Sequence, residues 1–233
     1  MTDIFHVLNR GVDKREIFLD DQDRFRFVHN LFEFNDQENV NNNFYYFHNN
    51  KNNDFASRYI KKGKAERQKR KLLVNVHAFC LMKNHYHLLL SPRIDGGIVR
   101  FMRKLNIGYS KYFNKKYERK GALFEGRYKW VVIKDDAHFI HIPYYIHLNP
   151  LDLKFPEWRK RELKNYKEAV KFLDNYRWSS HFDYAGKKNF PSVTQRDFLM
   201  KFFEGPEEYK KSICQWLKEL DLDSENFGEL FLE

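Results

Sequence analysis

Cysteine is scarce in this sequence, and long apolar runs are missing. Cys80 and Cys214 are the two cysteines among 233 residues and lie far apart, so we expect neither a disulfide framework nor a cysteine zinc site. No stretch approaches the roughly 18 consecutive apolar residues of a membrane-spanning helix. The opening residues, MTDIFHVLNRG, lack a basic segment followed by an apolar block. We therefore expect no signal peptide and a cytoplasmic protein.

The charge balance is strongly positive. The formal net charge is +10, which favours a polyanionic partner, with nucleic acid ahead of a membrane surface. Aromatic residues make up 18% of the chain, so some rings are expected at the surface. Exposed rings beside basic residues suit stacking on unpaired bases. Composition alone thus favours nucleic-acid binding without settling it.

Hydrophobic spacing predicts strands alternating with helices through residue 150. Strands are expected at four segments: 4–10, 72–82, 85–91 and 122–134. Helices are expected at three: 20–34, with Asp20 or Asp21 as N-cap, 98–120, and 135–150, which Asn149-Pro150 would stop. The order predicts an α+β fold in which two helices cover one face of an antiparallel sheet.

We expect a core over residues 1–150 and a mostly helical C-terminal extension over 151–233. Within the core, residues 35–71 are rich in asparagine and end in a dense basic run. This composition predicts a partly disordered insertion whose basic end touches DNA. A solvated surface arm is an equally good interpretation of the same run.

Two short motifs carry metal-capable side chains. In NHYHLLL at 84–90, His85 and His87 are two residues apart on a predicted strand, so they share a face. In YYIHLNP, Tyr145 and Asn149 are four residues apart on a predicted helix and also share a face. Two imidazole nitrogens and an amide oxygen suit Mg²⁺ or Mn²⁺. Each motif alone is more often structural, and only their joint presence suggests a site.

Phosphodiester cleavage by a tyrosine needs this set of groups. A free phenol has a pKa near 10, so it is a poor nucleophile at neutral pH without help. A metal that polarises the scissile phosphate supplies that help. Attack by Tyr145 would leave a 5′-phosphotyrosine and a free 3′-hydroxyl, so the strand could be rejoined without ATP.

Several segments together resemble the single-tyrosine HUH transposases of the insertion-sequence-200-like superfamily. The motifs are NHYHLLL, RKLNIGYSKYFNKKY, GALFEGRYKW and YYIHLNP, with IFHVLNRG and YRWSSHFDYAG closest to the REP-associated tyrosine transposase branch. The resemblance covers residues 4–34 and 72–186. It implies a ferredoxin-like core, a divalent metal, and single-stranded DNA with hairpin (palindromic) ends as substrate.

The same resemblance carries the family's two metal-binding histidines onto His85 and His87. It carries the nucleophile onto Tyr145 and the third metal ligand onto Asn149. Pro143 departs from the expected pattern, because a proline inside a helix removes a hydrogen bond. It could instead begin a fresh turn and re-aim Tyr145. The long 35–71 insertion is the other departure.

Other residues are candidates for supporting roles. His141, one turn before Tyr145, could act as a base or donate a hydrogen bond to the site, or be a partly exposed helix residue. His147 is expected at the surface. Candidate DNA contacts are Arg10 and Arg127, which adjoin glycines, and residues on the polar face of the 98–120 helix: Arg103, Lys104 and Lys111, followed by Lys115 and Lys116.

These expectations combine into one functional hypothesis. The chain is expected to be a metal-dependent DNA transposase, a strand transferase that acts as a monomer or homodimer and is nucleoid-associated when bound to DNA. One alternative is a domesticated, non-mobilising regulator that binds hairpin DNA without turnover. Another is an RNA-binding module, whose binding would depend on 2′-hydroxyls.

Overall fold

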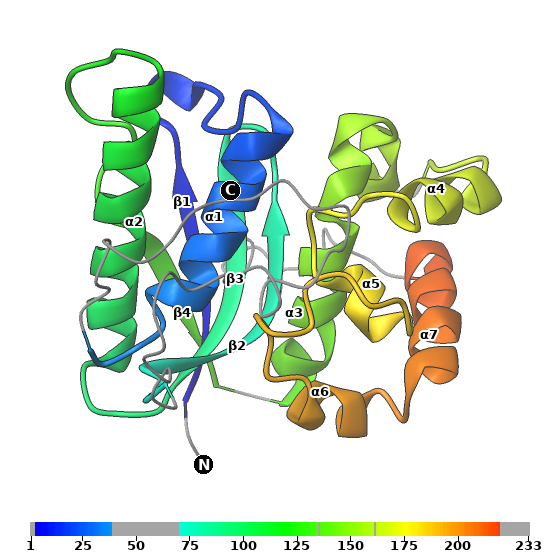
Figure 1. Cartoon of the computed structure of the whole chain (residues 1–233). Coiled ribbons are helices and arrows are strands. Elements are labelled where there is room, and N and C mark those ends of the chain that lie inside the picture. The colour runs from blue at the N-terminus through cyan, green and yellow to red at the C-terminus, as the bar shows by residue number, and fades with distance from the viewer. Residues whose placement is uncertain (1–2, 39–69, 135, 161, 220–233) are drawn as a thin grey trace.

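The structure of the chain is a computed structural model. It describes residues 3–38, 70–134, 136–160 and 162–219 (Figure 1). Most of the predicted 35–71 insertion lies outside these ranges, as do the predictions made for it.

Four antiparallel strands form a single sheet. They are β1 (Ile4–Arg10), β2 (Val74–Leu81), β3 (His85–Pro92) and β4 (Lys129–Ile133), in the spatial order β2-β3-β1-β4. Helix α1 (Asp21–Glu33) connects β1 to β2, and α2 (Gly97–Lys116) connects β3 to β4. This order and strand arrangement are those of the ferredoxin-like βαββαβ unit. The predicted α+β, ferredoxin-like fold is therefore confirmed.

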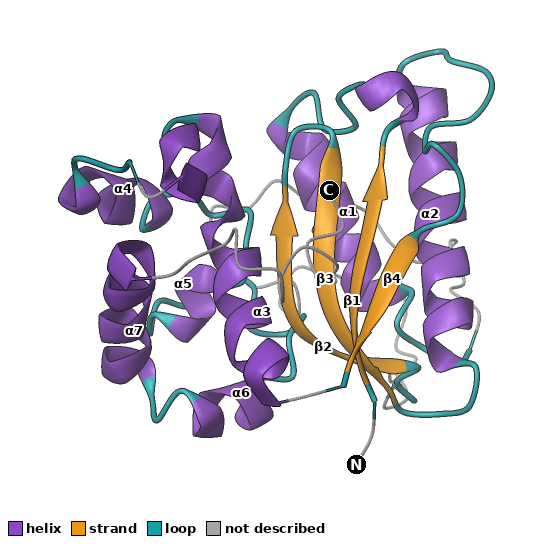
Figure 2. Cartoon of the chain, turned by 180° about the vertical axis from the view of Figure 1, so that it is seen from behind, coloured by secondary structure: helices purple, strands orange, loops and turns teal. Residues whose placement is uncertain are grey.

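Helices α1 and α2 cover one face of the sheet (Figures 1 and 2). Asp20 is the N-cap of α1 and accepts a hydrogen bond from the Asp23 backbone N–H at 2.9 Å. Lys116, in the last turn of α2, forms ion pairs with Asp20 at 2.7 Å and Asp23 at 2.8 Å. Gly108 lets the helices approach closely, because a Cβ there would collide with the Phe34 ring.

Helix α3 (Asp136–Leu148) packs against β2 and β3 on the opposite face. It continues through Pro143 without interruption, so the alternative in which Pro143 begins a fresh turn is wrong. The α-helix ends at Leu148, and residues 149–153 form a 3₁₀ turn containing Pro150. The predicted stop at Asn149-Pro150 is thus confirmed.

The described part of the chain after residue 153 consists of turns, three short helices and one longer helix, α7. These are a 3₁₀ turn (Pro156–Lys160), α4 (Tyr166–Leu173), α5 (His181–Tyr184), α6 (Asp197–Phe202) and α7 (Pro206–Glu219). Figure 2 shows α5, α6 and α7 on the side of α3 away from the sheet. Across the described ranges, no helix has the length and apolar character needed to cross a membrane.

A chain of buried polar groups joins α3 to these C-terminal helices. The Tyr209 hydroxyl lies 2.8 Å from Nδ1 of His147 and 2.8 Å from Nδ1 of His181. Nε2 of His147 lies 2.7 Å from the Ser180 hydroxyl. His147 is therefore fully buried, and its predicted surface position is wrong. The cause is that α3 is covered both by the sheet and by the C-terminal helices, so it has no solvent face there.

Candidate metal centre and nucleophile

His85 and His87 lie side by side on β3, with ring centroids 5.0 Å apart. Both are buried, and each uses Nδ1 within the protein: His85 toward Asn84 Oδ1 at 2.7 Å, and His87 toward His6 Nε2 at 3.0 Å. The Nε2 atoms of both rings are buried without a hydrogen-bond partner among the described residues. Buried polar atoms normally have partners, so this pair of orphaned nitrogens requires an explanation.

His6 is a member of this cluster that the sequence analysis missed. It is fully buried on β1, and its ring stacks on His87 with centroids 5.2 Å apart and an interplanar angle of 17°. The sequence contained one indication of this: His6 and Arg10 are an even number of positions apart, so both side chains point to the same face of β1. The strand register, with Leu8 opposite His87 and Arg10 opposite His85, is needed to show that this face carries the histidine cluster.

Helix α3 brings Tyr145 to the histidines. The ring centroid of Tyr145 lies 5.8 Å from that of His87 and 6.0 Å from that of His6, edge-to-face in both cases. One turn later, the Asn149 side chain donates a hydrogen bond to the Tyr145 carbonyl at 2.8 Å. The structure thus brings His85, His87 and Tyr145 into one cluster, with Asn149 bonded directly to the backbone of Tyr145.

Arg159 is the second residue that the sequence analysis missed. Its guanidinium lies 5.4 Å from the centre of the Tyr145 ring and donates to Asn149 Oδ1 at 3.2 Å. Two further bonds to the Asp152 carboxylate, at 2.8 and 2.6 Å, hold the guanidinium in place. A positive charge is therefore fixed beside the candidate nucleophile. In the sequence, Arg159 is one of several basic residues in EWRKRELK, and nothing there distinguishes it.

Burial and neighbouring charge keep the two β3 histidines neutral. Burial, reinforced by Arg10, lowers the pKa of His85 to about 4. Burial also lowers the pKa of His87 well below its usual value, with the adjacent His85 and His6 adding to the effect. Both rings are therefore in the neutral form at pH 7, which is the state that a metal ligand requires.

The donor set fits a divalent cation that accepts mixed nitrogen and oxygen ligands. Two neutral imidazole nitrogens are available, and Asn149 Oδ1 keeps a second lone pair while it accepts from Arg159. In the part of the chain that the structure describes, no group of three or more His, Cys, Asp or Glu is arranged to hold a metal. A cation held here would complete its coordination with the amide, water or substrate oxygens, as Mg²⁺ commonly does.

A basic cavity adjoins the histidines at the end of β1. Arg10, Arg127 and Lys129 line this cavity of about 250 Å³, together with Glu125. Across the sheet, Leu8 pairs with His87 on one side and with Lys129 on the other. Two of the predicted DNA contacts, Arg10 and Arg127, are thus brought together beside the candidate centre.

The other predicted contacts lie elsewhere. Arg103, Lys104 and Lys111 are on α2, which covers the opposite face of the sheet from the histidines. The Lys104 ammonium donates to the carbonyls of Asp36 at 2.6 Å and Glu38 at 2.8 Å, so it holds the segment after α1. His141 packs against Trp216 of α7, with ring centroids 5.1 Å apart. A role for His141 in the site stays a prediction.

Comparisons with known proteins indicate which family this chain resembles. Residues 49–149 match the family model described as "Transposase IS200 like". One solved structure with a similar chain is titled "Structure of the REP associates tyrosine transposase bound to a REP hairpin". It is 12% identical, the alignment covers 84% of this chain and 86% of that one, and the TM-score is 0.45. No curated protein matches the sequence. The family match confirms the predicted resemblance to the insertion-sequence-200-like superfamily over that segment.

Proposed function

Because residues 49–149 match the IS200-like transposase family, we propose that this chain is a metal-dependent transposase that nicks and rejoins single-stranded, hairpin-bearing DNA through Tyr145. One observation carries the proposal. His85 and His87 present two orphaned Nε2 atoms in the cluster that contains the Tyr145 ring. A cation site and a phenol in one cluster are the parts that tyrosine-mediated strand cleavage requires.

The roles of the side chains follow from their positions. His85, His87 and the Asn149 oxygen would hold Mg²⁺ or Mn²⁺, which would polarise the scissile phosphate. The Tyr145 oxygen would form a bond to phosphorus while the bond from phosphorus to the 3′ oxygen breaks. Arg159, fixed beside the Tyr145 ring, would favour loss of the phenol proton before attack and the negative charge that develops on the phosphate during it.

The basic cavity would hold the DNA backbone next to this centre. Arg10 and Arg127 present guanidinium groups, which bind phosphate oxygens in a bidentate manner, and Lys129 adds a third cation. Such contacts fix the position of the strand without reading its sequence. They would place one phosphate near Tyr145 and its neighbours along the cavity.

A denaturing gel with labelled single-stranded hairpin DNA tests the proposal directly. The wild-type chain with Mn²⁺ should give a covalent protein–DNA band, and this band should be missing with EDTA and in Tyr145→Phe. Tyr144→Phe is the matched control, because Tyr144 points toward Tyr209 and Phe203 rather than the histidines. An adduct that survives Tyr145→Phe would show that another residue is the nucleophile.

A hairpin-binding regulator without turnover is the second candidate. It is favoured by the complete burial of Tyr145 and by the bond that Arg159 makes to Asn149 Oδ1, which occupies one lone pair of that oxygen. Tight binding across a panel of DNA hairpins with no adduct would support the regulator. Competition by a matched RNA hairpin would instead favour the RNA-binding alternative.

A further inference from the structure

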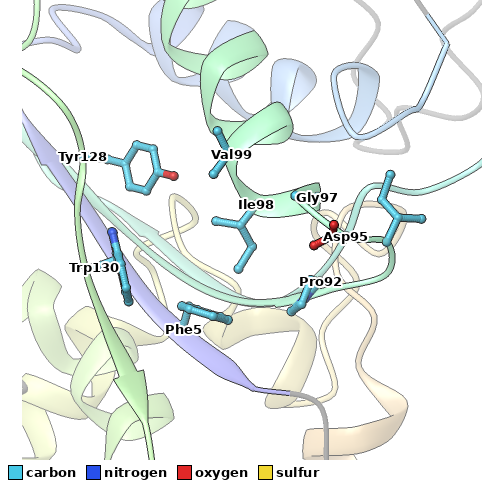
Figure 3. Close-up of a pocket in the computed structure, with 10 residues that line it drawn as sticks. Phe5, Pro92, Asp95, Gly97, Ile98, Val99, Tyr128 and Trp130 are labelled. Atoms are coloured by element: carbon cyan, nitrogen blue, oxygen red, sulfur yellow. The ribbon is translucent and has the colours of Figure 1, made fainter.

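An apolar pocket opens on the side of the sheet away from the histidines (Figure 3). The aromatic pocket, as we call it, is lined by the side chains of Phe5, Ile98, Val99, Tyr128 and Trp130, and by the turn from Pro92 to Gly97. Figure 3 shows Trp130, on β4, and Tyr128, just before that strand, facing the first turn of α2 across the pocket. Its volume is about 280 Å³, just below the ~300–1,000 Å³ typical of sites for drug-sized ligands.

Trp130 is the most unusual member of this pocket. It lies on β4, an edge strand, and 51% of its surface is exposed. The ring is nevertheless held in place by an edge-to-face contact with Phe5, with centroids 5.6 Å apart. Val99, across the pocket, is 61% exposed. A half-exposed indole that is held in place beside an apolar surface is suited to stack against another flat ring.

Strand β4 connects the aromatic pocket with the basic cavity. Successive strand residues point to opposite faces, so Lys129 belongs to the basic cavity while Trp130 belongs to the aromatic pocket. Just before the strand, Arg127 lines the basic cavity and Tyr128 lines the aromatic pocket. A DNA strand whose phosphates occupy the cavity would need only to cross the edge of the sheet for its next base to meet the indole.

We propose that the aromatic pocket binds one unpaired base of the DNA strand held in the basic cavity, stacked on Trp130. This inference rests on the proposed function, since it takes the same strand as ligand. The cations at the start of β4 and just before it argue for a nucleic acid over an apolar peptide. A bound base is apolar on its faces, and its phosphates are matched by Arg127 and Lys129. Stacking of this kind tolerates any base, because every base has an aromatic face. Since that face is accessible only in an unpaired base, the pocket would select unpaired over paired nucleotides.

The test measures binding in EDTA, so that no cleavage intervenes. The probes are one hairpin with a single-stranded flank and the same hairpin with blunt ends, the flank carrying 2-aminopurine at each position in turn. We expect quenching at one flank position with the wild-type chain and its loss in Trp130→Leu. Affinity for the flanked hairpin should fall about 5- to 150-fold, the range for losing one base–aromatic stack, while blunt-hairpin affinity stays unchanged.

Two control variants keep the outcome interpretable. Trp130→Phe retains an aromatic face and should keep most of the quenching. Phe198→Leu removes another half-exposed ring, on α6, and should change nothing. Equal losses on flanked and blunt hairpins, or unchanged quenching in Trp130→Leu, would overturn the proposal. So would a wild-type dimer that Trp130→Leu dissociates, since the pocket would then be a contact between copies.

The result is separable from that of the adduct assay. Position-specific quenching without any adduct would support base binding in the aromatic pocket and refute the proposed strand cleavage. An adduct without position-specific quenching would support strand cleavage and refute base binding in the pocket.

Discussion

Removing the hydrogen-bond acceptor behind His87 should weaken metal binding. If His87 binds a cation through Nε2, the proton of its neutral ring must be on Nδ1, which lies 3.0 Å from His6 Nε2. His6 then accepts this bond and fixes the metal-binding tautomer of His87. In His6→Leu, the acceptor is gone, and the His87 ring is free to move its proton to Nε2, where it blocks the metal.

The size of the effect follows from the burial of both rings, which are fully inaccessible. A buried donor left without a partner costs about 1–3 kcal/mol. At about 1.4 kcal/mol per tenfold, Mn²⁺ affinity should fall by about 5- to 150-fold. This range agrees with the ~10- to 100-fold losses that follow removal of a hydrogen-bond partner of a metal ligand.

Calorimetric titration of Mn²⁺ measures the loss, and the ¹⁵N shifts of the imidazoles in the metal-free protein report the tautomer of His87. His6→Gln supplies an oxygen acceptor and should recover most of the affinity. His77→Gln serves as a control, because His77 is a buried histidine on β2 that is bonded to Ser91 instead of this cluster. Unchanged Mn²⁺ affinity and an unchanged tautomer in His6→Leu would refute the reasoning.

Three further predictions concern charge, pH and the C-terminal helices. Arg159→Gln should slow adduct formation about 10- to 1,000-fold in single-turnover assays, because a fixed positive charge beside the Tyr145 ring is lost; an unchanged rate would show that Arg159 takes no part in the reaction. Burial holds the pKa of His77 at about 4, against about 6.5 in the unfolded chain, so protonation favours unfolding. Its contribution to stability should be complete above pH 6.5 and fall by up to about 3 kcal/mol toward pH 4, a dependence that urea unfolding should find reduced in His77→Gln; identical pH profiles would contradict it. Tyr209→Phe removes the hydroxyl shared by His147 and His181 and should lower the free energy of unfolding by about 1–3 kcal/mol; a loss under about 0.5 kcal/mol would mean that another group replaces the hydroxyl.

The sequence was sufficient to predict features that depend on residues close together along the chain. Alternation in NHYHLLL placed His85 and His87 on one face of a strand. The acidic start of α1 predicted Asp20 or Asp21 as the helix cap, and the structure shows that it is Asp20. The fold class followed from the order of the elements. The length of β4 did not: residues 122–128 form turns instead of strand, although their apolar pattern suggested otherwise.

The missed residues depend on contacts between distant segments. His6 joins the site because β1 pairs with β3, a register that periodicity within one strand cannot reveal. Arg159 joins it because the chain after α3 folds back over Tyr145. Lys104 looked like a DNA contact because helix spacing shows which face is polar, not which carbonyls lie above it. In each case the deciding partner is tens of residues away or on another element.

The position of β1 in the sheet has a consequence for synthesis of the chain. Although β1 is made first, it lies between β3 and β4, so both of its edges are paired only after residue 133 has been added. His6 is on this strand, Tyr145 is on the helix that follows β4, and Arg159 comes later still. A nascent chain therefore has none of the completed centre until its core has been translated. A chain released before β4 has been made would leave one edge of β1 unpaired and would lack both Tyr145 and Arg159.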